Sequence, residues 1–365
     1  MKNKLIKSVI LASSLLVSIG ICGVLKVGNA SAADVPNYIH SRISKQVNHM
    51  SYRQRIAQLF VVEVGNNTSA NNRYIRKYHP GGILLKGNNF TASRANDRYQ
   101  VKNMQKASGH NLLIGTDVEG GEVNRLSTIS PYPHYLSPSN EYSRHGLSGI
   151  RSEYNAIGKN MDNLGLNWDY APDADPSNGY MSFRTVKRGP YITAKYVHNA
   201  VQGLQNHKVA ATVKHYPGYR GNQDTDYYPT YSNINHKTYQ NDLVPFKKNG
   251  NSDSIMTNSV IYKRIARSPA NLSRNIIMPL RDHYNGVIIT DSLNTGAIRH
   301  YLRHRHGSAD YYSLKAGNTM VMNSDLSSKL SGLVNDMHKG YLSKELIDTD
   351  VGRVLTLKYK LGLKY

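Results

Sequence analysis

Eight short apolar runs, rich in β-branched residues, recur between residues 59 and 323 and are separated by stretches long enough for helices. The runs are 59–64, 82–85, 112–118, 166–171, 209–215, 254–260, 286–293 and 318–323. Between them, 93–108, 150–164, 191–206 and 271–283 have the composition of amphipathic helices. Parallel strands covered by helices produce this alternation, and eight units favour closure. We therefore predict an α/β fold, a single-domain (β/α)8 TIM-like barrel.

Several of these runs end in a residue that can take part in chemistry. These residues are Asp117 and Glu119, Asp169, Lys214 and His215, Asp291, and Asn323. Asp and Asn also cap helices and form turns, but five coinciding strand ends are harder to explain in that way. In a (β/α)8 barrel the carboxyl ends of the strands carry the active site. The sequence therefore predicts a site at this rim.

Lys214, His215 and Asp291 are the most informative of these residues. Lys214 closes an otherwise apolar run, and burying it without a partner is costly, so a carboxylate or a polar ligand must face it. A sugar with several hydroxyls would serve. Asp291 ends the run 286–293, and a carboxylate held near Lys, Arg and His suits a nucleophile or a stabiliser of an oxocarbenium-like centre.

Residues 1–33 resemble an export signal. A basic start at Lys2, Lys4 and Lys7 precedes an apolar run over 8–25 and a small-residue site over 30–33. We predict cleavage there, which leaves a mature domain of residues 34–365; the alternative is a membrane span that stays attached. The single cysteine, Cys22, lies in the predicted signal, so the mature chain would have no disulfide and no thiolate metal site.

The chain carries a formal charge of +22, with 46 Lys and Arg against 24 Asp and Glu. Removing residues 1–33 takes away four lysines and no acid, which leaves +18 on the mature domain. These charges are scattered from Arg42 to Lys364, whereas a nucleic-acid-binding protein usually has a recognisable module or a concentrated basic run. An anionic cell wall or membrane surface is the favoured partner, and we expect a secreted, wall-associated bacterial protein.

Six segments, in order along the chain, carry a family resemblance. They read Gln-Leu-Phe at 58–60, Gly-Gly-Ile at 81–83, Asp-Val-Glu-Gly-Gly at 117–121, Asn-Trp-Asp-Tyr-Ala-Pro at 167–172, Lys-His-Tyr-Pro-Gly at 214–218 and Thr-Asp-Ser-Leu at 290–293. This pattern resembles glycoside hydrolase family 3, and within it the single-domain bacterial β-N-acetylglucosaminidases (β-N-acetylhexosaminidases). The resemblance implies a (β/α)8 barrel, a carbohydrate substrate, and neither cofactor nor metal.

The same resemblance implies roles for particular residues. In the family's retaining double displacement a carboxylate attacks the anomeric carbon, and that nucleophile falls on Asp291. The contacts to sugar hydroxyls fall on Asp117, Arg125, Lys214 and His215.

The loop after residue 218 departs from the family pattern, in which an Asp-His dyad acts as general acid/base. With one inserted residue, the dyad's Asp falls on Asp226 and its His on Tyr228, so the catalytic histidine is missing. A tyrosine of ordinary pKa is a weak acid near neutral pH. Three interpretations stay open: Tyr228, Asp224, Asp226 or His236 takes over, the leaving group needs little help, or the protein binds sugars without turnover.

Two further positions differ from the family, and one cluster of histidines has the spacing of a possible metal site. Met181 stands where the family has an arginine, so a cationic contact to the sugar is expected to be lost, and Glu122 also replaces an arginine. His300, His304 and His306 lie among arginines, which favours a solvated basic face over a zinc site.

The hypothesis from the sequence is a secreted β-N-acetylhexosaminidase acting on cell-wall or other extracellular amino-sugar glycans. Asp291 would be the nucleophile, and the loop around Asp226 and Tyr228 would cover the leaving group. The alternative is a weak or inactive barrel that serves as a wall-binding protein.

Overall fold

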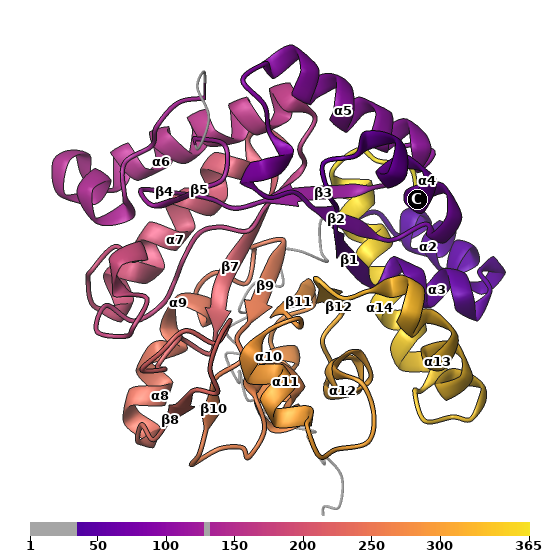
Figure 1. The fold of residues 1–365 in the computed structure, drawn as a ribbon. Coiled ribbons are helices and arrows are strands. Elements are labelled where there is room, and N and C mark those ends of the chain that lie inside the picture. Colours follow the sequence, from indigo (N-terminus) through magenta and orange to yellow (C-terminus); the bar gives the residue numbers. More distant parts are fainter. Residues whose placement is uncertain (1–34, 128–131) are drawn as a thin grey trace, which may run out of the picture.

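The computed structural model describes residues 35–127 and 132–365, and its centre is a closed barrel of eight parallel strands surrounded by helices (Figure 1). The predicted export signal at 1–33 lies outside the described residues. The strand order around the barrel is β1-β12-β11-β9-β7-β6-β3-β2. The strand bounds are β1 Phe60–Glu63, β2 Gly82–Leu84, β3 Leu113–Thr116, β6 Trp168–Asp169, β7 Ala210–Tyr216, β9 Ser254–Thr257, β11 Val287–Ser292 and β12 Met320–Met322. Each predicted apolar run supplies one barrel strand, so the predicted fold is confirmed.

The helices lie outside the strands and connect them. Their bounds are α2 Asn37–His49, α3 Tyr52–Gln58, α4 Thr68–Tyr78, α5 Arg94–Ala107, α6 Pro138–Leu164, α7 Pro190–Gln205, α8 His236–Asp242, α9 Val244–Lys247, α10 Arg274–Arg281, α11 Gly296–Leu302, α12 Ala309–Ala316, α13 Leu326–His338 and α14 Lys344–Lys360. Short 3-10 turns occupy Gly87–Asn89, Ser182–Arg184 and Ala270–Leu272. The four predicted helices correspond to α5, α6, α7 and α10. The last is shorter than predicted, because a 3-10 turn precedes it.

Local sequence signals set the ends of these helices. The hydroxyl of Ser137 accepts a hydrogen bond from the backbone N–H of Asn140 and caps α6, and Pro138 fills the first helical position. Gly165 ends the same helix in the left-handed conformation. Pro190 begins α7 in the same way as Pro138 begins α6.

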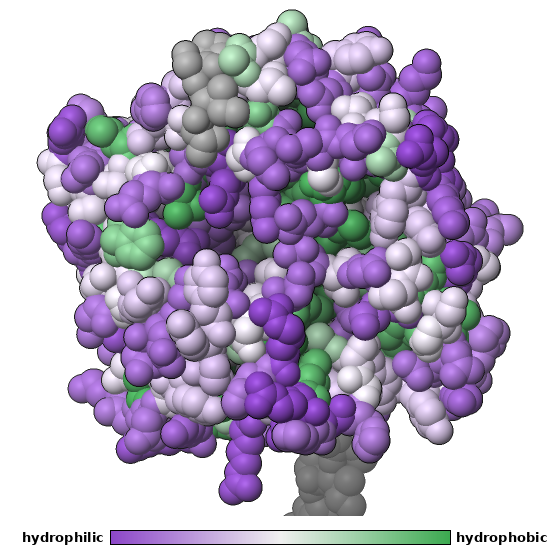
Figure 2. Space-filling view, viewed as in Figure 1, coloured by the Kyte–Doolittle hydropathy of each residue, from purple (hydrophilic) through white to green (hydrophobic). Residues whose placement is uncertain are grey.

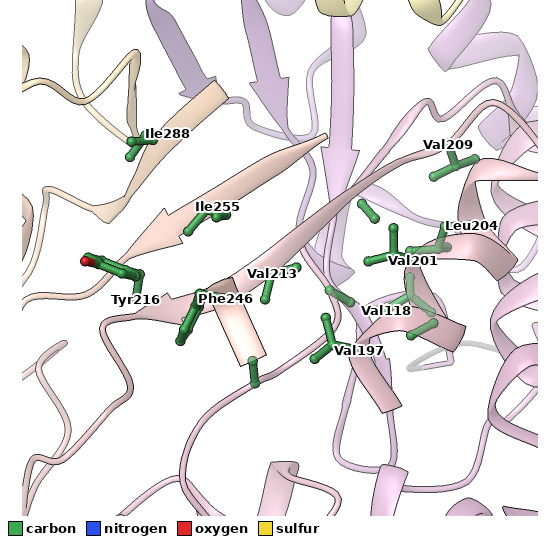
Figure 3. Packing of buried hydrophobic residues seen from close by; sticks show 14 of the residues in the cluster. Val118, Val197, Val201, Leu204, Val209, Val213, Tyr216, Phe246, Ile255 and Ile288 are labelled. Carbon is green, nitrogen blue, oxygen red and sulfur yellow. The ribbon is translucent and has the colours of Figure 1, made fainter. Parts of the chain in front are cut away.

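The core lies between the barrel strands and the helices that cover them. On one side, Val197, Val201 and Leu204 of α7 pack toward Val209 and Val213, which lead into and form β7 (Figure 3). Complete burial of such side chains contributes roughly 1.5–3 kcal/mol each. This packing fixes β7, the strand that carries two of the predicted site residues.

Trp168 links three neighbouring strands and is fully buried. Its indole N–H lies 2.8 Å from the Thr212 hydroxyl on β7 and 3.0 Å from the Ser254 hydroxyl on β9. A buried indole needs such an acceptor, because an unpaired N–H would cost free energy. The two hydroxyls therefore allow a large aromatic ring inside this part of the barrel.

Two small ribbons lie outside the barrel. β4 (Val118–Gly120) pairs antiparallel with β5 (Val123–Asn124), and β8 (Tyr231–Ser232) pairs parallel with β10 (Ile261–Tyr262). Both ribbons belong to connections that follow barrel strands, so they extend the rim where the site was predicted. Among the described residues, no helix combines the length and the apolar character that crossing a membrane requires.

Candidate active site

The first acidic residues of the site, Asp117 and Glu119, follow strand β3. The β4–β5 ribbon turns at Gly120, whose φ is +86° and where a Cβ atom would lie 2.2 Å from the Leu136 carbonyl oxygen. Only glycine fits such a turn. The ribbon returns the chain to Asp117: the Arg125 N–H donates to its carbonyl at 2.9 Å, and Arg125 Nε lies 3.8 Å from Asp117 Oδ2.

Lys214 reaches this acidic pair from strand β7. It is 1 % exposed, and its Nζ lies 2.8 Å from Asp117 Oδ1 and 2.6 Å from Glu119 Oε1. Burial alone would lower the pKa of Lys214, but Asp117 and Glu119 together raise it above its usual value. The expectation that a carboxylate faces this buried lysine is confirmed, and the lysine stays charged.

Arg184, at the end of the 3-10 turn after β6, binds Glu119 from the other side. Its Nε and Nη2 lie 2.9 and 2.5 Å from the two carboxylate oxygens of Glu119, and its Nε lies 3.5 Å from Asp173 Oδ2. Burial raises the pKa of Glu119, but Arg184 and Lys214 outweigh burial and hold that pKa well below its usual range. This bidentate pair fixes the position of Glu119 between two cations.

Met181 does not leave this segment without a cation, because Arg184 follows three residues later; the loss of a cationic contact to the sugar stays a prediction. Met181 is buried, and its sulfur lies 3.6 Å from Arg184 Nη1. One turn of 3-10 helix separates the two residues, so the guanidinium enters the site from position 184. Glu122, the other departure from the family, is exposed on the β4–β5 turn.

His215 is buried next to Lys214 and is held by Asp175. The Nδ1 atom of His215 lies 2.7 Å from Asp175 Oδ2, and Asp175 Oδ1 accepts the backbone N–H groups of His215 and Tyr219 at 3.1 and 2.7 Å. Burial, followed by Arg184, lowers the pKa of His215 to about 4, and burial raises the pKa of Asp175 to about 6. At neutral pH a neutral imidazole therefore donates from Nδ1 to an ionised carboxylate, and Nε2 is left as an acceptor.

Asp291 lies at the carboxyl end of β11, with one oxygen accepting the N–H of Ser292 at 2.7 Å. Burial raises its pKa, and the Ser292 N–H and the charged Lys214 offset only part of that rise. At the end of the neighbouring strand β12, the Asn323 side-chain amide donates to the Ser292 hydroxyl at 3.0 Å. The barrel thus brings Asp291 into the field of the Lys214 and His215 pair, as the sequence suggested.

The loop after β7 is held from outside at its start and at its tip. At the start, the Tyr219 N–H donates to Asp175, and within the loop the Tyr219 hydroxyl donates to the Gln223 carbonyl at 2.7 Å and accepts the Thr225 N–H at 2.9 Å. At the tip, the Asp226 carbonyl accepts the N–H of Gly296, the first residue of α11, at 2.6 Å. Since α11 follows Asp291 along the chain, these bonds tie the loop to the strand end that carries Asp291.

Asp226 and Tyr228 differ in how they relate to the site. Burial and Asp224 raise the pKa of Asp226, whereas Lys86, Arg184 and others lower it, and Asp226 in turn raises the pKa of Asp291. The Asp226 carboxyl is therefore within electrostatic range of the site. The side chains of Asp226 and Tyr228 are both exposed; Tyr228 is 57 % exposed, and its ring lies against that of Tyr227, with the centroids 6.3 Å apart. No hydrogen bond joins its hydroxyl to a site residue among the described parts of the chain.

Within the described residues, Asp173, Asp175 and His215 form a group whose ligand atoms all lie within 4.8 Å of one another, close enough to hold a metal ion. Several contacts within and around this group are made by the protein itself. His215 Nδ1 is bonded to Asp175, the Asp175 N–H donates to Asp173 Oδ1 at 2.8 Å, and Arg184 is next to Asp173. A guanidinium this close to a ligand oxygen disfavours a second cation, so the group fits a brace for His215 better than a metal centre.

The sequence did not single out Arg184, Asp173 and Asp175 as site residues. A signal for the two aspartates was present, because the segment Pro172-Asp173-Ala174-Asp175 follows directly on a barrel strand and places two carboxylates two residues apart. Asp169 was noted as a strand end. Its Oδ1 accepts the Val118 N–H at 2.9 Å, and burial raises its pKa well above the usual value.

The histidine cluster lies apart from this site. His300, His304 and His306 are exposed on α11 and the turn that follows it, which agrees with a solvated basic face.

Both a family model and individual proteins are similar to this chain. The family model described as "Glycosyl hydrolase family 3 N terminal domain" matches residues 51–357. The chain is 24 % identical over 326 residues to Beta-hexosaminidase A of Pseudoalteromonas piscicida, an alignment that covers 79 % of this chain and 54 % of that protein. It is 25 % identical over 339 residues to Beta-hexosaminidase LpqI of Mycobacterium tuberculosis, covering 85 % of this chain and 83 % of the relative.

Solved structures show the same similarity. A glycoside hydrolase family 3 β-N-acetylglucosaminidase from Paenibacillus sp. superposes with a TM-score of 0.80 at 26 % identity, covering 86 % of this chain and 63 % of that one. LpqI of M. tuberculosis has a TM-score of 0.78 at 24 % identity, covering 87 % and 96 % of the two chains. The chain thus spans little more than half of the Pseudoalteromonas protein and less than two thirds of the Paenibacillus protein.

Proposed function

Because this chain belongs to glycosyl hydrolase family 3, we propose that it is a retaining β-N-acetylhexosaminidase that removes a terminal β-linked N-acetylhexosamine from a glycan. One observation carries the proposal: the Asp291 carboxylate lies at a barrel strand end within the field of the braced His215 and the charged Lys214. The names of the two hexosaminidase relatives support the choice of sugar.

The proposed reaction has two displacements. An Asp291 oxygen attacks the anomeric carbon while the bond to the leaving-group oxygen breaks and that oxygen takes a proton from an acid. Water then gives its proton to the resulting base, its oxygen bonds to the anomeric carbon, and Asp291 is released. Asp117, Arg125, Lys214 and His215 hold the sugar hydroxyls during both steps.

We assign the proton donor to Asp226 in preference to Tyr228. A general acid works best when its pKa is near the working pH, and burial with a neighbouring Asp224 raises the pKa of Asp226 in that direction. Its carboxyl acts electrostatically on Asp291, as an acid across the scissile bond must. Both side chains are exposed, but among the described residues Tyr228 has no hydrogen bond into the site, and the main influences on the pKa of Asp291 include Asp226 and not Tyr228.

The nucleophile is tested with an aryl β-N-acetylglucosaminide. Wild-type protein is expected to release the phenol, and Asp291→Asn to lose at least about 10³-fold in kcat. Binding of N-acetylglucosamine, measured by calorimetry, should survive in the variant. Activity that persists in Asp291→Asn would overturn the assignment.

The acid is tested with leaving groups of different basicity. Asp226→Asn should lose about 10²–10⁴-fold on a phenyl glycoside and much less on a dinitrophenyl glycoside, whose departure needs little protonation. Added azide should speed the Asp226→Asn enzyme and give the β-glycosyl azide, because azide needs no general base. Tyr228→Phe is the matched control and should change little. The reverse result would make Tyr228 the acid.

A second candidate function follows from the same loop. Tyr228 stands where the family has its catalytic histidine and does not enter the site, so a barrel that binds amino sugars without cleaving them is the alternative. It predicts saturable binding of N-acetylglucosamine, no product from aryl or oligosaccharide substrates, and no loss of binding in Asp226→Asn. Any turnover that depends on Asp291 would exclude it.

We also propose that the protein is exported and acts on cell-wall glycans. The support is the signal-like segment 1–33 and the charge of +18 on the remainder. Cell fractionation should place the protein in the wall fraction, and raising salt from about 0.15 M to about 1 M should release it, since exposed charges are then screened beyond about 3 Å. Retention that is unchanged by salt would contradict electrostatic wall binding.

A further inference from the structure

A pocket outside the active site contains basic and aromatic side chains but no acidic ones. It has a volume of about 500 Å³ and lies between the β8–β10 ribbon, helix α11 and the turn after this helix. Its lining includes Lys263, Arg267 and Arg305 as permanent cations, together with His300 and His304. Four other surface pockets of the described residues each include at least one carboxylate. This difference points to an anionic occupant.

The three permanent cations have no acidic partner within the described residues. Lys263, Arg267 and Arg305 are exposed, and none of them forms an ion pair there. Unpaired like charges gathered around one hollow repel one another, and an anion placed among them relieves that repulsion.

Two tyrosines add sugar-binding character to the same pocket. Tyr231 is 43 % exposed, with Lys263 Nζ 4.6 Å from its ring centroid. Arg305 Cζ lies 4.0 Å from the ring centroid of Tyr301, and Arg305 Nη1 donates to the Tyr301 carbonyl at 2.6 Å. Two of the three cations, Lys263 and Arg305, are therefore held by tyrosine rings, and a partly exposed aromatic ring can pack against the apolar face of a sugar.

The pocket is continuous with the loop that covers the active site. Pro229 lines it and follows Asp226 by three positions, so their Cα atoms lie within about 11 Å of each other even in a fully extended chain. The loop is also bonded to α11 through Gly296 and Ala297, the helix that supplies His300 and Tyr301. A glycan that runs from the active site over this loop reaches the pocket.

We propose that this pocket binds a carboxylate or phosphate group on a sugar chain whose terminal N-acetylhexosamine occupies the active site, so that the protein selects acidic glycans. The inference rests on the proposed function for the direction of the chain. Most of the face drawn in Figure 2 is hydrophilic, which suits contact with a hydrated polymer over an extended area. The basic face is therefore assigned a ligand, in addition to its solvation.

The test compares oligosaccharides of equal length in the Asp291→Asn background, so that binding is measured without turnover. The probes are neutral chitohexaose, a hyaluronan hexasaccharide with N-acetylglucosamine at its non-reducing end, and chitohexaose carrying 6-phosphate groups. The two acidic probes distinguish carboxylate from phosphate as the recognised group. We expect at least one of them to bind about 10-fold or more tightly than the neutral probe at about 0.15 M salt.

The variants separate the pocket from the overall charge. The pocket triple Lys263→Glu, Arg267→Glu, Arg305→Glu should lose 10-fold or more in affinity for the acidic probe and leave the neutral probe unchanged. The matched triple Lys102→Glu, Lys159→Glu, Lys195→Glu changes the charge equally at exposed sites on α5, α6 and α7 and should lose less than about 3-fold. Replacing the three pocket residues by Gln should give an intermediate loss.

Several outcomes would overturn the proposal. They are equal losses in the two triples, equal affinity for neutral and acidic probes, or tighter binding of a single-stranded oligonucleotide or an anionic vesicle than of any glycan by the same pocket. Thermal unfolding checks that both triples are folded, and the Gln triple keeps the test usable if the Glu triple is not. If the wild-type protein cleaves no substrate but the pocket triple still weakens acidic-glycan binding, the proposed function is refuted and the pocket proposal stands.

Discussion

At the scale of single residues, the site is a network of buried charges that are paired with one another. Lys214 and Arg184 lie on either side of Glu119, and Asp175 orients His215. Each charge would be costly to bury alone, so removing one of them leaves its partner buried without compensation and destabilises the whole network.

An arginine at position 181 should take over part of the role of Arg184. Arg184→Met leaves Glu119 buried next to a single cation, and we expect a loss of about 3–5 kcal/mol in the free energy of unfolding together with most of the sugar binding. In the double variant Met181→Arg, Arg184→Met, a guanidinium returns from one 3-10 turn earlier and should restore part of both. Chemical denaturation and calorimetry measure the two effects.

Arg188→Met is the control for that experiment, because Arg188 is exposed, donates to a neighbouring carbonyl and lies over the Tyr142 ring, but within the described residues forms no ion pair with a residue of the site. A double variant no better than Arg184→Met would show that the position of the cation is specific to residue 184.

Activity should decline as the pH falls through about 6. Burial raises the pKa of Asp175 to about 6 and also raises that of Asp291, so both carboxylates take up protons earlier than ordinary ones. A protonated Asp175 no longer fixes His215, and a protonated Asp291 is no nucleophile. The measurement is the pH profile of kcat/KM on a dinitrophenyl glycoside, whose leaving group needs little protonation, so that the acidic fall in activity reports on Asp175 and Asp291 alone. Activity that stays constant down to pH 4.5 would contradict the prediction.

At the scale of elements, the loop after β7 derives its position from α11. The N–H groups of Gly296 and Ala297 donate to the carbonyls of Asp226 and Thr225 at 2.6 and 3.1 Å. The first N–H groups of a helix have no partner inside it, so they are free to hold a neighbouring segment. The helix that follows Asp291 thereby places the proposed acid opposite the proposed nucleophile.

Gly296 should be sensitive for this reason. A Cβ atom at position 296 would lie 2.0 Å from the Tyr227 carbonyl oxygen, so Gly296→Ala must push the loop away from the helix. We expect kcat/KM on a phenyl glycoside to fall about 10-fold or more, with a small change in Tm. A crystal structure of the variant would show the displaced loop.

The matched control is Gly352→Ala in α14, where a Cβ atom would meet nothing within 4 Å. It should leave activity unchanged and raise stability by about 0.5–1 kcal/mol, as expected for alanine in a helix. Full activity in Gly296→Ala would show that the loop position is unimportant for turnover.

At the scale of the whole molecule, the two ends of the described chain pack against each other outside the barrel strands. Helix α14 packs against α2 and α3, and its Lys358 is completely buried with Nζ 2.6 Å from Gln58 Oε1. Burial lowers the pKa of Lys358 to about 7. The contact between the two chain ends therefore contains a buried amine, and within the described residues its polar partner is Gln58.

This amine makes stability depend on pH. Between about pH 7 and 10 the unfolded chain holds a proton on residue 358 that the folded chain has released, so the free energy of unfolding should rise with pH, by up to about 1.4 kcal/mol per pH unit. Lys358→Met should be more stable than wild type at pH 7.5 and should lose this rise. Denaturation at pH 7.5 and 9.5 measures both; an unchanged slope would contradict the assignment.

The sequence by itself determined the barrel and much of its rim. The spacing of eight β-branched runs predicted the eight strands, and polar residues at the ends of those runs placed Asp117, Lys214, His215 and Asp291 at one edge. This works because strand burial and side-chain period are local properties that the sequence displays directly.

Only the tertiary structure decided which charges pair and which loop residue meets the site. Arg184 reaches Glu119 across 65 positions and His215 reaches Asp175 across 40. Such contacts, and the pKa shifts that follow from them, depend on barrel closure and burial, which no local pattern encodes. The same reason applies to Asp226 and Tyr228: both side chains are exposed, and only the folded loop brings the Asp226 carboxyl within electrostatic range of Asp291.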